Sequence, residues 1–421
     1  MQIKISLANG LYRVVAVGIC VSAVVLAVLV SKWAFGHAVA INATEAEIAA
    51  FGVDLAPSDP RTHLDHAFLL EKTFLPADQA KALSEFEQAA ALSPNNYLNW
   101  LFLGRAREQA GDPVGAERSL LKALELAPNY SRVQWALGNS LLRQGRYDEG
   151  FVYIRGAVAA DMTFSNPAAT AAWQIFGGDV VKIKNALGGS SRINASMAVL
   201  LAGNKRYAEA LEFWRQVPAD EKESGTKEAA RSLYAKFIEA ALYGSAIEIA
   251  NSAQLFPDET ISSETVSNGD FESALAQKEP SPFLWIIADG SYPAIGLNGS
   301  QKHGGNYSLL LNFGQGGKGF RPVSQKIGVR GGSSYEMIFY HRSEVKAQAR
   351  LVCQVISAAD ASVLASAVIA ASAGWAEIRM PFSVPADTEG IELKINADGC
   401  SADGCSISGN VWFDDFSLVK R

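Results

Sequence analysis

A residue pattern that repeats every 34 positions between residues 94 and 157 constrains the fold of this chain more than any other feature. The repeating positions are Pro94 and Pro128, Gly104 and Gly138, Gly111 and Gly145, and the series Phe86, Leu120, Ile154 and Ala89, Ala123, Ala157. A fixed period of this length is typical of stacked helix pairs. Small residues at shared positions let helices approach closely, and proline ends a helix. The sequence therefore predicts an array of helix pairs.

The repeat resembles that of the tetratricopeptide repeat (TPR) family. The residues at that family's signature spacings are Trp100, Leu103, Gly104, Ala116, Leu120, Ala123 and Pro128. The second repeat departs from the pattern, with Gln134 where tryptophan is usual and Met162 where proline is usual. The resemblance implies an all-α TPR solenoid over residues 60–257. It does not identify a partner, because TPR arrays bind many unrelated proteins.

Such arrays form a concave groove that is lined mainly by the first helix of each pair. The polar candidates for contact with a protein partner are Asn99, Arg105, Arg107, Asn139 and Arg143. The functional interpretation is a groove that binds a peptide or protein. The alternative is that these residues form ordinary solvated polar faces.

An apolar run near the N-terminus is expected to form a transmembrane helix. The run Val14–Val30 carries no charge, and counted from Leu11 it has about the 20 residues that a membrane helix needs. Lys32 and Trp33 follow, where a snorkelling cation and an interfacial aromatic ring are expected. Residues 1–37 are therefore expected to be a cytoplasmic stub and membrane anchor, and residues 38–59 a linker.

The charges that flank this run predict its orientation. Lys4 and Arg13 precede it, and Glu45 and Glu47 lie beyond it. The positive-inside rule then places the N-terminus in the cytoplasm and the bulk of the chain in the periplasm or outside the cell. The alternative is a cleaved signal peptide, because residues 38–40 have the small-x-small form of a cleavage site. The apolar run exceeds a usual signal core, which favours a retained anchor.

From Ile261 the helical period gives way to short alternating apolar segments separated by glycine-rich turns. The segments expected to be strands are residues 307–313, 335–341, 349–356, 375–382, 391–396 and 411–419. Many short strands at regular spacing predict an antiparallel sandwich over residues 258–421.

Four stretches of this C-terminal region resemble carbohydrate-binding modules of the galactose-binding-like jelly-roll type. They are Ser267 to Glu272, Gly304 to Leu309, Gly374-Trp375 and Trp412 to Leu418. The resemblance implies a jelly-roll sandwich with Trp375 and Trp412 in its core. Relatives of this fold bind glycans, and others serve only as adhesion or spacer modules. The resemblance also implies a structural calcium ion held by Glu272 and Asp415, with backbone carbonyls near Asn306. The alternative is that these carboxylates pair with nearby cations.

Strand alternation predicts a patch for a polysaccharide ligand. On the strand from Tyr335, alternate residues face the core and leave Tyr340 and Arg342 outward, and on the next strand Arg350 and Gln354 are outward. We expect these four residues to share one sheet, bordered by Trp285 and Tyr292. The alternative for each is a purely structural role.

Composition excludes several classes of function. The net charge is -6 and no basic stripe occurs, so nucleic-acid binding is not expected. The four cysteines are too scattered for a zinc site, although Cys400 and Cys405 could close a small disulfide loop or remain free thiols. Metalloprotease and nucleophile-elbow motifs are absent, and the adjacent Asp414 and Asp415 would point to opposite faces of a strand. We therefore do not expect an enzyme.

The leading interpretation is a non-catalytic, membrane-anchored envelope protein that combines a TPR array for protein binding with a glycan-binding jelly roll. By analogy with other TPR proteins, it would act in assembly or export of a cell-surface polysaccharide. The second interpretation is a pure scaffold with the sandwich as a docking or spacer module. The third is a glycan-active enzyme, which would need two facing carboxylates.

Overall fold

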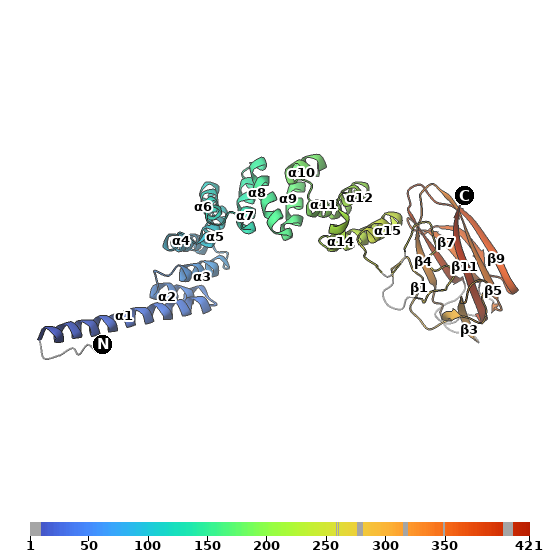
Figure 1. Ribbon diagram of the computed structural model, residues 1–421, viewed down its shortest axis with the longest axis horizontal. Coiled ribbons are helices and arrows are strands. Elements are labelled where there is room, and N and C mark those ends of the chain that lie inside the picture. Colours follow the sequence, from blue (N-terminus) through green and yellow to red (C-terminus); the bar gives the residue numbers. More distant parts are fainter. Residues whose placement is uncertain are drawn as a thin grey trace, which may run out of the picture. The chain divides into compact units, whose positions relative to one another are not determined.

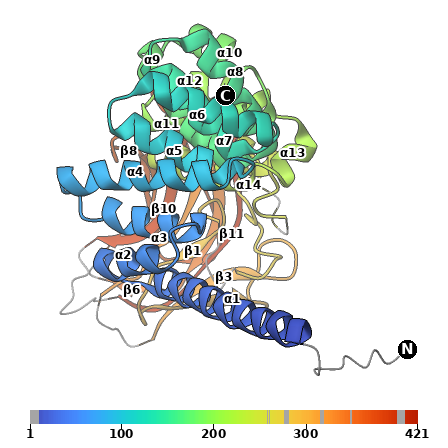
Figure 2. The same ribbon diagram turned by 90° about the vertical axis from the view of Figure 1, so that its left-hand side faces the viewer.

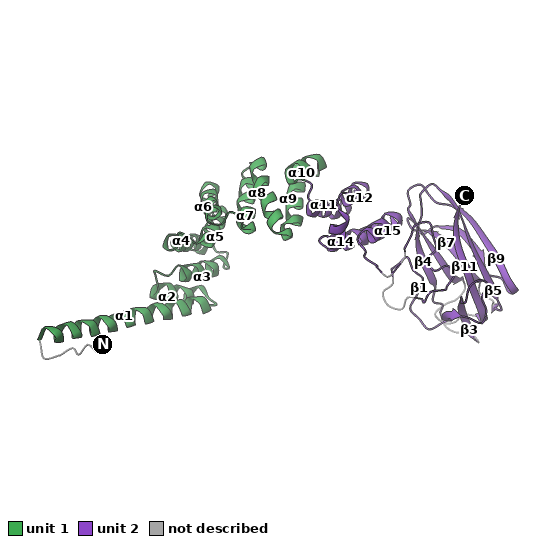
Figure 3. Ribbon diagram, viewed as in Figure 1, with its two compact units in different colours: residues 1–188 green, residues 189–421 purple. Residues whose placement is uncertain are grey.

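The computed structural model describes residues 10–257, 259, 261–275, 281–314, 319–347, 350–398 and 407–421. The chain forms two compact units, residues 1–188 and residues 189–421 (Figure 3). The first unit is helical. The second contains further helices and a β-sandwich.

The first unit consists of consecutive helices (Figure 1). They are α1 (Gly10–Asn42), α2 (Ala46–Leu55), α3 (Pro60–Glu71), α4 (Pro76–Leu92), α5 (Tyr97–Gln109), α6 (Pro113–Leu126), α7 (Ser131–Arg143), α8 (Tyr147–Ala160), the 3-10 turn η1 (Met162–Phe164), α9 (Ser165–Phe176) and α10 (Val180–Leu187). Helices α3 and α4, α5 and α6, and α7 and α8 pack as pairs. The helix-pair array predicted from the repeat is confirmed.

The repeat positions explain why these helices begin, end and pack where they do. The carboxylate of Asp112 accepts a hydrogen bond of 2.8 Å from the backbone N–H of Gly115 and caps α6. Gly111 follows the end of α5 with a φ of 78°, where a side chain would be strained. Gly104 lets α5 and α6 approach, since a Cβ there would lie 2.6 Å from Cγ of Leu120.

Helix α1 is long and apolar enough, by length and composition, to cross a membrane near the N-terminus. Its final turns pack on α2 (Figure 2). Gly36 and Ala40 are buried there, and a Cβ on Gly36 would lie 2.9 Å from the carbonyl oxygen of Gly52. Residues 38–59, expected as a linker, are instead the end of α1, helix α2 and a short turn. Small residues on both helices permit this close contact.

The second unit begins with helices α11 (Ser191–Gly203), α12 (Tyr207–Arg215), α13 (Ala219–Glu223), α14 (Lys227–Glu239) and α15 (Tyr243–Ser252). The strands follow as β1 (Ile286–Ile287), β2 (Ala294–Asn298), β3 (Ser308–Gly314), β4 (Val323–Gly328), β5 (Ser334–Ser343), β6 (Lys346–Ala347), β7 (Arg350–Ser357), β8 (Val363–Val368), β9 (Ser372–Ser383), β10 (Gly390–Asp398) and β11 (Ile407–Lys420).

The strands form two antiparallel sheets. The five-stranded sheet has the order β1-β4-β10-β7-β8. The six-stranded sheet has the order β2-β3-β11-β5-β9, and β6 pairs with β11. Alternate side chains of both sheets meet in one apolar core that includes Leu309, Phe339, Val355, Leu393 and Phe413. The predicted all-β jelly-roll sandwich is confirmed.

Helix α15 packs directly on the five-stranded sheet. The ring of Tyr243 lies over Gly390, where a Cβ would be 2.3 Å from Cδ2 of the ring. Ser245 donates a hydrogen bond of 2.9 Å from its hydroxyl to the carboxylate of Glu389. The last helices and the sandwich therefore belong to one compact unit.

Candidate functional site

One face of the six-stranded sheet points away from the core and carries aromatic and charged side chains. In β5, Phe339 is fully buried in the core, so Tyr340 and Arg342 lie on the opposite face. Glu377 of β9 is the register partner of Tyr340, and Trp412 of β11 is the partner of Arg342. Directly opposed residues share a face of a sheet. We call this surface the outer sheet face, made of Ile338, Tyr340, Arg342, Glu377, Arg379 and Trp412.

Hydrogen bonds fix the polar groups of the outer sheet face. The hydroxyl of Tyr340 donates to Oε1 of Glu377 at 3.0 Å. The guanidinium of Arg379 donates to both oxygens of Glu377, at 3.0 and 2.7 Å. The hydrogen bonds from Arg379 and then from Tyr340 hold the pKa of Glu377 below its usual value. Beside these residues lies an open depression of about 720 Å³ that also touches residues 268–270 and 415–417.

The loop of residues 299–307, between β2 and β3, lies over part of this face, and we call it the covering loop. The imidazole of His303 stacks on the ring of Tyr340, with centroids 3.7 Å apart. Nδ1 of His303 lies 2.6 Å from Oδ2 of Asp415. The carboxylate of Asp414 accepts hydrogen bonds from the backbone N–H groups of His303 and Gly304, at 2.8 and 3.2 Å. One side of the Tyr340 ring is therefore covered by a residue of the same chain.

Arg342 and Trp412 form the second part of the outer sheet face. The guanidinium carbon of Arg342 lies 5.8 Å from the centre of the Trp412 ring. Its Nη1 donates to Oε1 of Gln301 in the covering loop at 2.7 Å. Trp412 is only 6% exposed, yet it stands outside the sandwich core. Nε1 of Trp412 has no hydrogen-bond partner among the described residues.

The expected core positions of the two tryptophans are corrected by these contacts. Trp412 lies on the outer sheet face because its neighbours Val411 and Phe413 occupy the core. Trp375 is half-buried and meets the ring of His303 edge to face at 5.8 Å. The sequence did not predict that either tryptophan lies near the outer sheet face. Alternation along β11 places Trp412 on that face, because Val411 and Phe413 face the core.

The predicted single patch for a glycan does not form. Tyr340 and Arg342 belong to the six-stranded sheet, whereas Arg350 and Gln354 lie on β7 of the five-stranded sheet. Alternation predicts which way a side chain points but not the sheet to which its strand belongs.

The two bordering aromatic residues are also corrected. Trp285 is 2% exposed in the core, and its Nε1 donates to the carbonyl oxygen of Asn268 at 3.0 Å. Tyr292 packs against the core, and its hydroxyl donates to the carbonyl oxygen of Ile407 at 2.6 Å. Both rings are therefore occupied in packing the sandwich.

The two carboxylates implied as calcium ligands both contact the covering loop. Oε1 of Glu272 accepts from the backbone N–H groups of Tyr307 and Asn306 at 2.9 and 2.5 Å, and these bonds lower the pKa of Glu272. Asp415 contacts His303 instead. The described residues contain no group of three or more His, Cys, Asp or Glu side chains that could hold a metal ion. A calcium shell of about six to eight oxygens would thus need carbonyl oxygens of the loop.

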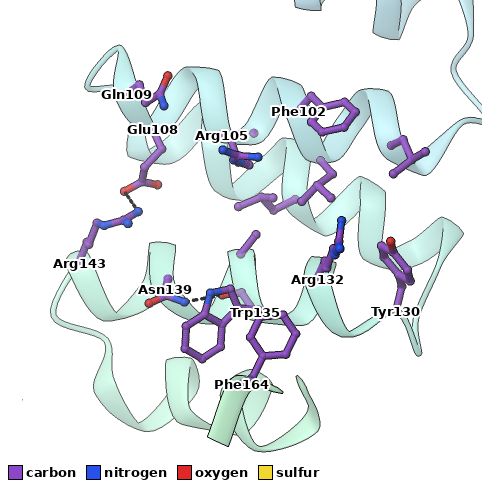
Figure 4. A pocket seen from close by; sticks show the side chains of 15 residues that line it. Phe102, Arg105, Glu108, Gln109, Tyr130, Arg132, Trp135, Asn139, Arg143 and Phe164 are labelled. Atoms are coloured by element: carbon purple, nitrogen blue, oxygen red, sulfur yellow. Dashed lines mark hydrogen bonds and ion pairs between the residues drawn. The ribbon is translucent and has the colours of Figure 1, made fainter. Parts of the chain in front are cut away.

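A groove between α5 and α7 is the second candidate site. Its volume is about 590 Å³. Figure 4 shows the side chains that line it. Three of the predicted residues, Arg105, Asn139 and Arg143, line it. Aromatic residues that were not predicted line it too, namely Phe102, Tyr130, Trp135 and Phe164. The stacked rings of Trp135 and Phe164 have centroids 4.8 Å apart.

Two predicted groove residues lie elsewhere. Asn99 is fully buried and donates from Nδ2 to the carbonyl oxygen of Ala89 at 2.9 Å, so it joins two helices. Arg107 does not line the groove and instead donates to Glu87 at 2.8 Å and to Ser119 at 3.0 Å. Both side chains hold neighbouring helices together. The sequence alone does not distinguish such a polar residue from one that faces the groove.

Cys400 and Cys405, which could close a disulfide loop or remain free thiols, lie outside the described residues. Cys353 is a free, fully buried thiol in the core, and burial raises its pKa. Cys20 is a free, exposed thiol on α1.

No protein-family model matches the chain, and no curated protein matches it. Solved structures that are similar to it include carbohydrate-binding modules and TPR proteins. A carbohydrate-binding module of family CBM4 is 15% identical over 37% of this chain and 99% of that one, with a TM-score of 0.29. The xylan-binding CBM22-1 module of Paenibacillus barcinonensis Xyn10C is 12% identical over 38% and 97%, with a TM-score of 0.28. YrrB, a TPR protein with an unusual peptide-binding site, is 16% identical over 51% and 94%, with a TM-score of 0.27.

Proposed function

We propose that this chain is a non-catalytic, membrane-anchored protein of the cell envelope. Its helical array docks a protein partner, and the outer sheet face of its sandwich binds a glycan. The anchor is the apolar part of α1, with the N-terminus in the cytoplasm and the bulk in the periplasm or outside the cell. In this role the protein would assist assembly or export of a cell-surface polysaccharide.

The observation that carries the glycan proposal is the chemistry around Tyr340. A flat aromatic ring offers an apolar surface for the C–H groups of a sugar, and hydroxyl groups need fixed polar neighbours. Tyr340 has such neighbours in Glu377, to which it donates at 3.0 Å, and in Arg379, which holds Glu377 in place. This ordered aromatic and polar set, on the face of the sheet that points away from the core, supports the binding of a ligand.

A glycan-array screen of the full-length protein in detergent micelles tests the glycan proposal. We expect saturable binding to at least one surface glycan. Deletion of the gene that encodes the protein should also reduce the amount of surface polysaccharide on the cells that produce the protein. Absence of binding to every glycan, together with unchanged polysaccharide, would overturn the proposal.

A pure scaffold is the second candidate, favoured by one observation. Helix α15 packs on the five-stranded sheet through Tyr243 and Gly390, so the sandwich is held firmly by the helices that precede it. A rigid spacer would need such a contact. Two strains test this alternative, one that carries the Tyr340→Ala variant and one that lacks the protein. Normal polysaccharide output from the first but not from the second would favour the scaffold function.

A further inference from the structure

We propose that the groove between α5 and α7 binds an acidic segment of a partner protein, with carboxylates at Arg105 and Arg132 and an apolar side chain against Trp135 and Phe164. This inference rests on the proposed protein-docking role of the helical array and specifies the chemistry of the partner. It is independent of glycan binding by the sandwich.

The groove has an excess of positive charge. Three arginines line it, Arg105, Arg132 and Arg143, against one carboxylate, Glu108. Glu108 is already engaged, since it accepts a hydrogen bond of 2.5 Å from the hydroxyl of Ser140 and lies 3.5 Å from Nη1 of Arg143. Glu108 therefore neutralises Arg143. The guanidinium groups of Arg105 and Arg132 are left without a carboxylate partner among the residues that line the groove.

Arg105 and Arg132 are exposed and form no ion pair with any carboxylate in the described part of the chain. Burial raises the pKa of Glu71, and the charge of Arg105 acts on that pKa in the opposite direction without a direct ion pair. The two side chains come from α5 and α7, the helices that face each other across the groove (Figure 4). Each planar guanidinium can donate two parallel hydrogen bonds to a carboxylate, so the pair fits two acidic side chains of one segment.

Aromatic rings supply the apolar part of the site. Trp135 and Phe164 stack at 4.8 Å, and Phe102 and Tyr130 also line the groove. These rings are only half-buried, so they offer a surface for an apolar side chain of the partner. Aromatic and arginine side chains together are the groups that contribute most to protein interfaces.

The charge of the whole chain makes this site selective. The chain carries a net charge of -6, so an acidic peptide is repelled by most of its surface and gains only at a local basic site. Such binding should weaken as salt is added, because the guanidinium groups are exposed and are screened within about 10 Å at 0.1 M salt.

Fluorescence polarisation of the full-length protein in detergent micelles tests the proposal. The probe is a labelled twelve-residue peptide in which Asp and Glu alternate with Leu and Phe, and the reference peptide has Asn and Gln in place of Asp and Glu. We expect saturable binding of the acidic peptide that is at least about tenfold tighter than that of the amide peptide. The double variant with Arg105→Ala and Arg132→Ala should lose this difference.

Arg118→Ala is the matched control, because Arg118 is an exposed arginine on α6 that does not line the groove. It should leave binding unchanged. A variant with Arg105→Lys and Arg132→Lys retains the positive charge. If the site binds carboxylates, this variant should keep part of the affinity for the acidic peptide. Circular dichroism establishes that each variant is folded.

Three outcomes would overturn the proposal. Equal binding of both peptides would leave a docking groove but remove its preference for acids. Unchanged binding by the double alanine variant would place the peptide elsewhere. Failure of both peptides to bind, while labelled polygalacturonate binds and depends on Arg105 and Arg132, would make the groove a site for an anionic polysaccharide. Glycan binding through Tyr340, measured on the same preparation, distinguishes each of these results from failure of the sandwich proposal.

Discussion

The imidazole of His303 lies 3.7 Å above the ring of Tyr340 and almost parallel to it, at an interplanar angle of 11°. Asp415 holds the imidazole in this place through Nδ1 at 2.6 Å. If Tyr340 is the platform for a sugar ring, His303 occupies the same surface. A ligand must then displace His303 or bind beside it.

The first prediction concerns this competition. Replacement of His303 by alanine frees one side of the Tyr340 ring, so glycan affinity should rise by about three- to tenfold, which corresponds to the roughly 0.5–1.5 kcal/mol expected for a stacked aromatic pair. Titration calorimetry with a glycan found in the array screen measures the change. Lys302→Ala is the control in the same loop. Weaker binding by His303→Ala would mean that His303 contacts the ligand itself.

The second prediction concerns the junction between α1 and α2. Replacement of Gly36 by valine places a Cβ 2.7 Å from Cβ of Leu55 and 2.9 Å from the carbonyl oxygen of Gly52, so the helices must separate. Overpacking of this kind costs about 1–3 kcal/mol. The thermal unfolding midpoint should fall by several degrees. Gly18→Val is the control, since nothing lies within 4 Å of a Cβ at Gly18. Equal midpoints for the two variants would contradict the packing.

The third prediction concerns pH, and it depends on the pair Glu85 and His63. Oε2 of Glu85 lies 2.5 Å from Nδ1 of His63, and Oε1 lies 3.2 Å from Nδ1 of His66. Burial raises the pKa of Glu85, but the contacts with both histidines outweigh it and lower the pKa to about 2. Burial lowers the pKa of His63, but its contacts with Glu85 and with the carbonyl oxygen of Pro57 outweigh that effect and raise it.

The signs of these two shifts define a window of greatest stability. The contribution of Glu85 is present above its unfolded pKa of 4.5 and is lost as the pH falls toward 2. The contribution of His63 is present below its unfolded pKa of 6.5 and is lost as the pH rises through its higher folded value. The free energy of unfolding should therefore be greatest between about pH 5 and 6.5.

Urea unfolding followed by circular dichroism from about pH 2 to about pH 9 measures this window, because the acid decline lies between the unfolded and folded pKa values of Glu85. Glu85→Gln should flatten the decline on both sides. Glu87→Gln is the control, because Glu87 is a half-exposed carboxylate that pairs with Arg107. Identical pH profiles for the two variants would show that the Glu85 pair does not govern stability.

The fourth prediction concerns calcium at the covering loop. We propose that Glu272 and Asp415 hold the ion together with carbonyl oxygens of the loop. Millimolar calcium should then raise the unfolding midpoint of the protein, because a ligand that binds only the folded state stabilises it by mass action. Asp415→Asn should reduce the rise. Superimposable unfolding curves in calcium and in chelator would exclude the ion.

Sequence periodicity predicted the folds of both parts because helix pairs and alternating strands each impose a fixed spacing. Gly104 and Leu120 meet as the repeat requires, and Phe339 is buried as alternation requires. These features depend on residues close in sequence. The periodicity of a helix or strand is thus sufficient to predict its buried face.

The sites could be predicted only in part, because they depend on how distant segments come together. Arg350 points outward as expected but belongs to the other sheet. Asn99 has the spacing of a groove residue, yet it is buried against the carbonyl oxygen of Ala89. The contact of His303 with Tyr340 joins a loop to a strand and leaves no periodic signal in the sequence.

The measurement that tests the central claim most directly is calorimetric titration of the full-length protein, and of its Tyr340→Ala and Arg350→Ala variants, with the glycan that binds best in the array screen. Arg350 is the control on the opposite sheet. We predict that Tyr340→Ala weakens binding by at least about tenfold, whereas Arg350→Ala binds like the unmodified protein. Equal affinity of the unmodified protein and the Tyr340→Ala variant would contradict the claim that the outer sheet face is the glycan site.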